Sequence, residues 1–219
     1  MNYCKFDYQK LEVVKNGFDH NLYKKITPSE KVDKALEDIG IEKPYIFYIG
    51  RLEKKKNTPA LIEAYAFLKE KHKDIKHKLL LVGNASYGYD ETKYMIREFD
   101  LVDDVIIPGW LEEDIIPYLY NGASLFVFPS KYEGFGIPIL EAMACGTPVI
   151  ASNSSSIPEV AGKAAQYFNP DFSLSIAEVM YKTLTNDELR KTMIDSGFKQ
   201  AAKFSWEKCA KSTLDIISK

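Results

Sequence analysis

The chain has 219 residues and a formal net charge of −2, with 29 Lys and Arg against 31 Asp and Glu. This near balance argues against a nucleic-acid binder that relies on bulk positive charge. A chain of this length can bury enough surface to fold without disulfides or bound metals. The three cysteines are too widely spaced for a disulfide framework or a zinc site, and with no recognisable signal peptide or membrane-spanning run we expect a cytoplasmic protein.

The predicted elements begin with a leader over residues 1–25, followed by a polar helix. A strand over Leu11–Val14 is expected to end in a turn at Asn16-Gly17, because Asn-Gly favours a turn. A helix is expected over Ser29–Ile39, and Gly40 is expected to end it.

Short apolar segments with the length and composition of buried strands follow. They are Pro44–Gly50, Lys78–Gly83, Val105–Ile107, Leu125–Phe128, Val149–Ala151 and Ala165–Phe168. Helical segments alternate with them, which predicts parallel strands, right-handed crossovers and helices on both faces. The predicted fold class is α/β: a Rossmann-like, six-stranded parallel sheet over residues 26–203 with C-terminal helices, and a last helix in residues 204–219.

Capping residues indicate where several helices begin. Thr58 is expected as an N-cap with Pro59 in the first turn, and Asn186 and Ser205 are expected to cap the last two helices. The predicted helices after the one that Thr58 opens are Asp90–Phe99, Ile115–Tyr120, Ile139–Ala144, Ser173–Leu184, Asp187–Phe204 and Trp206–Ile217.

The most informative stretch is Lys131–Pro148, which reads as a glycine turn followed by a buried helix that Pro138 opens. The backbone N–H groups at such a helix start form an anion site, and glycines let a phosphate approach closely. Glu133 and Glu141 flank this turn, and a carboxylate can accept paired hydrogen bonds from a sugar diol. Taken alone, the pair also fits a glycine turn with two solvated glutamates.

The segment Glu133-Gly-Phe-Gly-Ile-Pro-Ile-Leu-Glu141 resembles the Glu-x7-Glu motif of family 4 retaining glycosyltransferases (glycosyl transferases group 1). These enzymes have the GT-B fold, with two Rossmann-like domains. The segment Asn16-Gly-Phe-Asp19 resembles the one that leads into the C-terminal domain of this family. The resemblance therefore implies half of a GT-B fold: a C-terminal donor-binding domain whose N-terminal, acceptor-binding partner is missing.

The resemblance assigns roles to individual residues. The loop Gly50-Arg-Leu-Glu-Lys-Lys-Lys56-Asn resembles the family's diphosphate-binding loop, although a solvated basic loop would read similarly. Catalytic roles are implied for Arg51, Lys56 and Glu133. Substrate-binding roles are implied for Gly50, Leu111, Ser130, Gly134, Phe135, Gly136, Ile137 and Glu141.

Within this scheme each part of the donor has its own contacts. Glu133 would face the sugar and Glu141 the ribose, while the N–H groups of Phe135 to Ile137 would serve the diphosphate or sugar. Leu111 would lie against the base, and Trp110 would either stack or face the core. The turn Gly83-Asn-Ala-Ser86 departs from the family's Val-Gly-x-Gly pattern, which leaves ligand contact there open.

The function implied is binding of a UDP- or GDP-sugar by a retaining glycosyltransferase that transfers a hexose to a glycan, lipid or small-molecule acceptor. No Asp-x-Asp motif stands at a strand end, so we expect neither a metal nor another cofactor. The isolated chain is expected to be inactive. The full enzyme could associate peripherally with a membrane, and exposed apolar residues of the last helix could drive self-association.

Two alternatives remain open at this point: a nucleotide-sugar epimerase of GT-B fold and a non-catalytic nucleotide-binding module. A Rossmann dehydrogenase is disfavoured, because no Gly-x-Gly-x-x-Gly follows the first strand of the predicted sheet.

Overall fold

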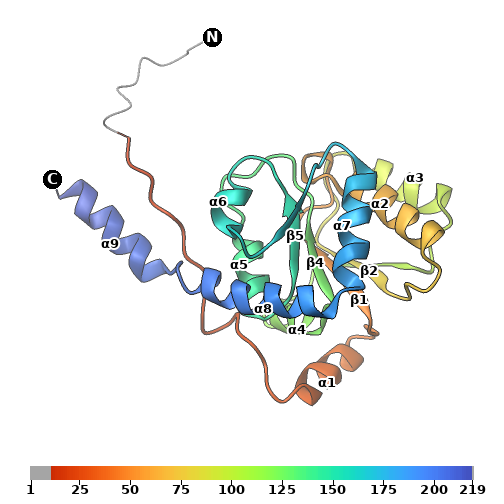
Figure 1. Ribbon diagram of the computed structural model, residues 1–219, viewed down its shortest axis with the longest axis horizontal. Coiled ribbons are helices and arrows are strands. Elements are labelled where there is room, and N and C mark those ends of the chain that lie inside the picture. The colour runs from red at the N-terminus through yellow and green to blue at the C-terminus, as the bar shows by residue number, and fades with distance from the viewer. Residues whose placement is uncertain (1–10, 219) are drawn as a thin grey trace, which may run out of the picture.

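A computed structural model describes residues 11–218, which contain a six-stranded sheet (Figure 1). The strands are β1 (Tyr45–Ile49), β2 (Lys78–Val82), β3 (Val105–Gly109), β4 (Leu125–Phe128), β5 (Val149–Ser152) and β6 (Gln166–Phe168). They lie in the order β3-β2-β1-β4-β5-β6, and every neighbouring pair is parallel. The Rossmann-like parallel sheet predicted from the alternation is confirmed.

Helices cover both faces of this sheet (Figure 1). The described helices are α1 (Glu30–Asp38), α2 (Thr58–Lys71), α3 (Tyr89–Glu98), α4 (Ile116–Gly122), α5 (Ile137–Ala144), α6 (Ile157–Ala161), α7 (Ser173–Leu184), α8 (Asp187–Ala201) and α9 (Trp206–Ile217), with a 3-10 turn η2 (Lys54–Lys56). Helix α9 stands clear of the sheet. Strand β1 shows how the core is divided: Ile46 and Tyr48 pack towards α2 and α7, and Tyr45 and Phe47 towards α4 and α5. Burial on both faces explains the continuous apolar runs.

The predicted boundaries hold for most elements. Helix α7 has the predicted bounds, and the side chains of Asn186 and Ser205 accept the expected capping hydrogen bonds. Helix α8, however, ends at Ala201, three residues before the predicted Phe204, whose side chain is buried in the core instead. Phe204 is apolar because its side chain packs in the core, and this pattern was misread as a continuation of the helix.

Two expectations about local structure were wrong, and one helix was not predicted. Residues Leu11–Val14 are not part of a strand, and Val13 is 85% exposed. Asn57, not Thr58, is the N-cap of α2, and the Thr58 hydroxyl hydrogen-bonds the Thr92 hydroxyl. Helix α6 was not predicted, because its five residues are too few to show a helical period.

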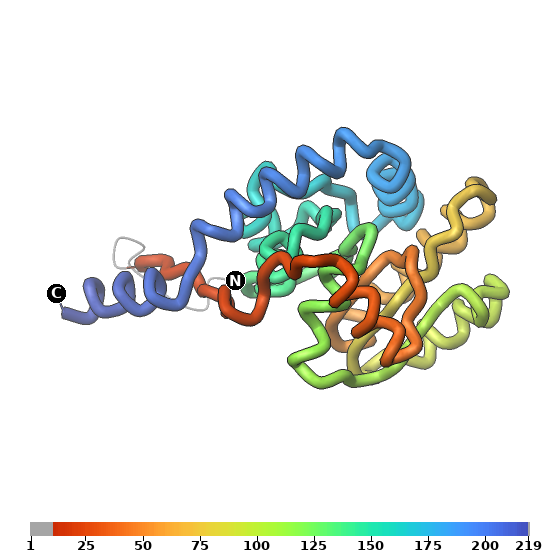
Figure 2. Tube along the Cα trace, turned by 90° about the horizontal axis from the view of Figure 1, so that it is seen from below, coloured from red at the N-terminus to blue at the C-terminus, as the bar shows by residue number. Residues whose placement is uncertain are grey.

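The first described residues and helix α9 lie outside the sheet and next to each other. Helix α9 has no buried residue, and Figure 2 shows it beside the segment that precedes Gly17. A Cβ at Gly17 would lie 2.1 Å from the Trp206 backbone nitrogen, so these segments touch at their base. None of the described helices is long and apolar enough to cross a membrane.

Candidate functional site

The candidate site lies at the carboxyl ends of β1 and β4, where the strand order reverses direction. Ligands of open parallel sheets bind at such switch points. A cavity of about 490 Å³ opens there, and its lining includes Tyr23, Gly50, Arg51, Asn84, Leu111 and Glu141. Four residues predicted for the site therefore share one cavity.

The loop after β1 is held by the loop after β2. The Leu52 N–H donates to the Asn84 carbonyl at 3.0 Å, and Leu52 forms a β-bridge with Ala85. Gly83 has a φ of +139°, and a Cβ there would lie 2.0 Å from the Gly50 carbonyl oxygen. Only glycine permits this approach, so Gly83 sets the distance between two loops that line the cavity. Ala85, one of the two residues that could stand at the family's second glycine position, forms this bridge between the loops.

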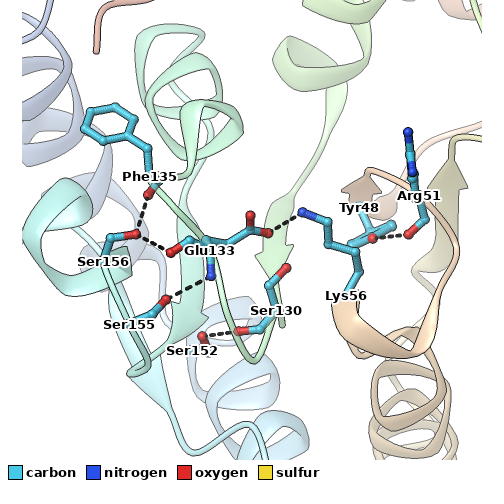
Figure 3. Close-up of polar contacts among 9 residues, drawn as sticks. All are labelled: Tyr48, Arg51, Lys56, Ser130, Glu133, Phe135, Ser152, Ser155 and Ser156. Atoms are coloured by element: carbon cyan, nitrogen blue, oxygen red, sulfur yellow. Dashed lines mark hydrogen bonds and ion pairs between the residues drawn. The ribbon is translucent and has the colours of Figure 1, made fainter. Parts of the chain in front are cut away.

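Asn57 places Lys56 beside the turn that follows β4. Its backbone is left-handed, with a φ of +63°, and its buried amide donates to the carbonyls of Pro129 and Pro170 at 3.2 and 2.8 Å. Lys56 Nζ then contacts Glu133 Oε1 at 2.6 Å (Figure 3). Because these side chains are only 24% and 13% exposed, water screens the ion pair less than it screens a surface pair.

Arg51 behaves differently from Lys56. Its carbonyl accepts a hydrogen bond from the Tyr48 hydroxyl at 2.9 Å, while its exposed guanidinium extends away from the loop (Figure 3). Among residues 11–218 no carboxylate pairs with that guanidinium. Of the two cations predicted to bind the diphosphate, Lys56 is therefore engaged by Glu133, and Arg51 pairs with no carboxylate of residues 11–218.

The turn between β4 and α5, residues 133–137, contains backbone donors that no protein group of residues 11–218 engages. Within the described chain, no protein group accepts a hydrogen bond from the N–H of Gly134, Phe135, Gly136 or Ile137. Gly136 has a φ of +110° as the N-cap of α5, while a Cβ at Gly134 would meet open space. Unpaired donors at a helix start are a feature that binds anions, and the anion site expected from the sequence stays a prediction.

Ser130 lies beneath this turn and does not line the cavity. The residue is fully buried, its carbonyl accepts from the Ser152 hydroxyl at 2.6 Å, and its own hydroxyl has no hydrogen-bond partner among residues 11–218. Figure 3 shows that hydroxyl pointing towards the space between Glu133 and Lys56.

Glu141 lines the cavity from the second turn of α5. Tyr120 Oη donates to its Oε2 at 2.9 Å. Burial raises the pKa of Glu141 to about 7 and the charge of Glu113 adds to this, whereas the Tyr120 hydrogen bond opposes it. Burial, followed by the charge of Glu141, holds the pKa of Tyr120 well above its ordinary value. This carboxyl therefore titrates near neutrality.

The loop after β3 forms another wall of the cavity. Leu111 is partly buried and lines it, and Trp110, which is 60% exposed, lies at the same wall. The core-facing alternative for Trp110 is thus wrong, and the indole is free to contact a ligand.

The structure brings the predicted residues into two adjoining groups. Gly50, Arg51, Leu111 and Glu141 line the cavity, and Lys56 and Glu133 stand at the 133–137 turn. Several contributors were not predicted: Tyr23, Glu113, Tyr120, Ser155 and Ser156. Asn84, in the turn where ligand contact was left open, lines the cavity. Glu113 follows a strand end, a signal that could have found it, while the other four residues are placed by long-range packing. Within residues 11–218 no cluster of His, Cys, Asp or Glu could hold a metal ion.

Comparison with known proteins gives a consistent result. The family model described as "Glycosyl transferases group 1" matches residues 30–200. The O-antigen chain mannosyltransferase B of Escherichia coli is 36% identical over 171 residues, which cover 78% of this chain and 45% of that protein. The chain thus spans less than half the length of this relative.

Two solved structures extend the comparison. HepE from Anabaena, in complex with UDP and glucose, superposes with a TM-score of 0.82 at 25% identity over 94% of this chain and 56% of that one. The C-terminal domain of LpcC, a glycosyl transferase group 1 family protein from Francisella tularensis, gives 0.73 at 25% identity over 85% of this chain and 97% of that one. Nothing in these comparisons supports the epimerase alternative.

Proposed function

The chain belongs to the glycosyl transferases group 1 family, and on that premise we propose that it binds the nucleotide-sugar donor of a retaining hexosyltransferase. One observation carries this proposal: four backbone N–H groups without protein acceptors lie at a switch point between Glu133 and Glu141. A nucleotide-sugar would match these groups, with its ribose diol at Glu141, its diphosphate at the N–H groups and its sugar at Glu133.

The cavity suits the nucleoside part of the donor. Its volume of about 490 Å³ lies in the range of small-molecule sites. The Glu141 carboxylate would accept hydrogen bonds from both ribose hydroxyls. Leu111 and Trp110 would offer apolar surface to the base. The structure of HepE, which is 25% identical, is in complex with UDP and glucose, and this supports a nucleotide ligand.

The 133–137 turn suits the diphosphate. Its N–H groups, the free Arg51 guanidinium and the Lys56 ammonium would oppose the negative charge. An ammonium has three N–H donors, so Lys56 can keep its contact with Glu133 while it donates to a phosphate. Glu133 would thereby face the sugar next to the leaving diphosphate. Donors fixed where negative charge grows stabilise the transition state of sugar transfer.

The complete enzyme would need a second domain. The chain spans 45% of the length of its E. coli relative, and we propose that the acceptor site and its base belong to a partner N-terminal domain. Without that domain the acceptor is not oriented, and the proximity contribution is lost. We therefore propose that the isolated chain binds donor without turning it over, and a product assay over many acceptors tests this.

The exposed side of α9 is a candidate contact surface. Trp206, Leu214 and Ile217 are 48%, 60% and 74% exposed, so the isolated chain is expected to self-associate through them. Sedimentation of the chain and of a Leu214→Ser variant would show this, with the variant more monomeric. We further propose a cytoplasmic enzyme that works without a metal and whose full form associates peripherally with a membrane.

Donor identity follows from the relatives only as a proposal. The E. coli relative is named a mannosyltransferase, so a mannosyl donor is the first candidate, and the UDP complex of HepE makes UDP-sugars the second. A thermal-shift panel of UDP- and GDP-sugars, with NAD as control, tests both. A ligand that binds only the native state raises the melting temperature, because at a hundredfold excess over its Kd it adds about 2.7 kcal/mol to the free energy of unfolding. No shift with any nucleotide would refute the proposal.

A further inference from the structure

The loop between β5 and α6 lies beside the 133–137 turn and hydrogen-bonds its backbone (Figure 3). The Glu133 N–H donates to Ser155 Oγ at 3.0 Å. The Ser156 hydroxyl is shared between two carbonyls, those of Glu133 at 3.0 Å and Phe135 at 3.2 Å. All three contacts act on the backbone of the turn, so they set its path whatever its side chains do.

These contacts determine where the turn's donors point. The peptide bonds that follow Glu133 and Phe135 are trans, and a trans peptide directs its C=O and its N–H to opposite sides. When Ser156 draws both carbonyls towards α6, the N–H groups of Gly134 and Gly136 face the other way. These are two of the four donors that have no protein acceptor.

The backbone conformation of Ser155 is strained, and its hydroxyl accounts for why a serine stands there. Its φ is +50°, a left-handed conformation that L-residues other than Gly, Asn and Asp seldom adopt. The side chain is nevertheless a hydroxyl that faces the Glu133 N–H. A glycine would relieve the backbone strain but would leave that N–H without its acceptor.

We propose that Ser155 and Ser156 are positioning residues that orient the 133–137 turn for the donor diphosphate and hold Glu133 opposite Lys56. The inference rests on the proposed function. It implies that losing either hydroxyl leaves the nucleoside cavity intact and weakens only ligands that reach the turn. A purely structural role would weaken all ligands together.

Four variants of the full chain separate these roles. Ser156→Ala removes the hydroxyl that donates to both carbonyls, and Ser156→Thr keeps a hydroxyl at the same position. Ser155→Gly removes the acceptor while relieving the strained φ. Ser154→Ala is the matched control, because the Ser154 hydroxyl makes no hydrogen bond within the described chain. The probes are UDP and GDP against uridine and guanosine, measured by calorimetry, together with the melting temperature of each variant.

For whichever diphosphate the unmodified chain binds, Ser156→Ala should weaken binding about tenfold, as expected for the loss of one good hydrogen bond. Nucleoside binding should stay unchanged, and Ser156→Thr and Ser154→Ala should bind like the unmodified chain. Ser155→Gly should weaken the diphosphate while its melting temperature holds or rises.

Two results would overturn the positioning role: unchanged diphosphate binding by Ser156→Ala, or equal losses for nucleoside and diphosphate. Failure of the unmodified chain to bind any diphosphate would instead refute the proposed function, and the inference with it.

Discussion

Donor affinity should depend on pH through Glu141, because this carboxyl titrates near neutrality. Burial is the main reason that its pKa rises from 4.5 to about 7. A carboxylate accepts hydrogen bonds from both hydroxyls of a ribose, whereas a protonated acid has lost part of that capacity. The donor should therefore bind the ionised form, and a proton must leave when the pH is below 7.

The size of the effect follows from the pKa. If only the ionised form binds, the apparent Kd at pH 6 should be about ten times that at pH 8, because a carboxyl with a pKa of about 7 is roughly 9% ionised at pH 6 and roughly 91% ionised at pH 8. An intact nucleotide-sugar is the ligand to use, because its doubly esterified diphosphate does not titrate in this range. Calorimetry at both pH values gives the ratio directly.

The nucleotide-free chain should show the opposite dependence in its stability. A folded-state pKa of about 7 against 4.5 unfolded means that the native state binds the proton more tightly. The neutral acid's contribution is fully present below pH 4.5 and is lost as the pH rises through 7, by about 3 kcal/mol. Urea unfolding at pH 5 and pH 8 measures the difference.

Glu141→Gln is the control for both measurements, because it keeps an acceptor but cannot titrate. It should flatten the affinity ratio and remove about 3 kcal/mol from the pH dependence of stability, whatever the histidines contribute. In a second variant, Glu113→Gln, the affinity transition should move to lower pH, because the Glu113 charge raises the pKa of Glu141. An affinity that is equal at pH 6 and 8, or a pH profile that Glu141→Gln leaves intact, would refute this reasoning.

The remaining predictions concern the loops and the turn. Lys56→Ala should weaken nucleoside diphosphate binding by about 1.5–3 kcal/mol, whereas Lys54→Ala should do little because Lys54 faces Glu91 instead; equal losses would mean diffuse charge. Glu133→Ala should spare UDP or GDP and weaken only the nucleotide-sugar in competition binding, and a matching loss of UDP or GDP affinity would contradict its placement at the sugar. Gly83→Ala should lower the free energy of unfolding by about 1–3 kcal/mol in urea titrations, since its Cβ would overlap the Gly50 carbonyl.

The sequence by itself determined the parts of this protein that depend on neighbours along the chain. Strands such as Leu125–Phe128 are apolar throughout because both of their faces are buried, and that pattern is visible before folding. The glycine turn with Pro138 likewise announces a helix start, and Glu133 and Glu141 stand at a fixed spacing across it. Their assignment to a donor, however, came from resemblance to a family.

Only the tertiary structure decided which groups meet and how they titrate. Lys56 and Glu133 are 77 residues apart, and their contact depends on the buried Asn57 amide that ties two loops together. The pKa of Glu141 depends on burial and on Glu113, and the turn's donors are aimed by Ser156 from another strand end. Hydrogen bonds and desolvation act through space at a few ångströms. A linear pattern can therefore name candidate groups, while the fold alone sets their distances and charges.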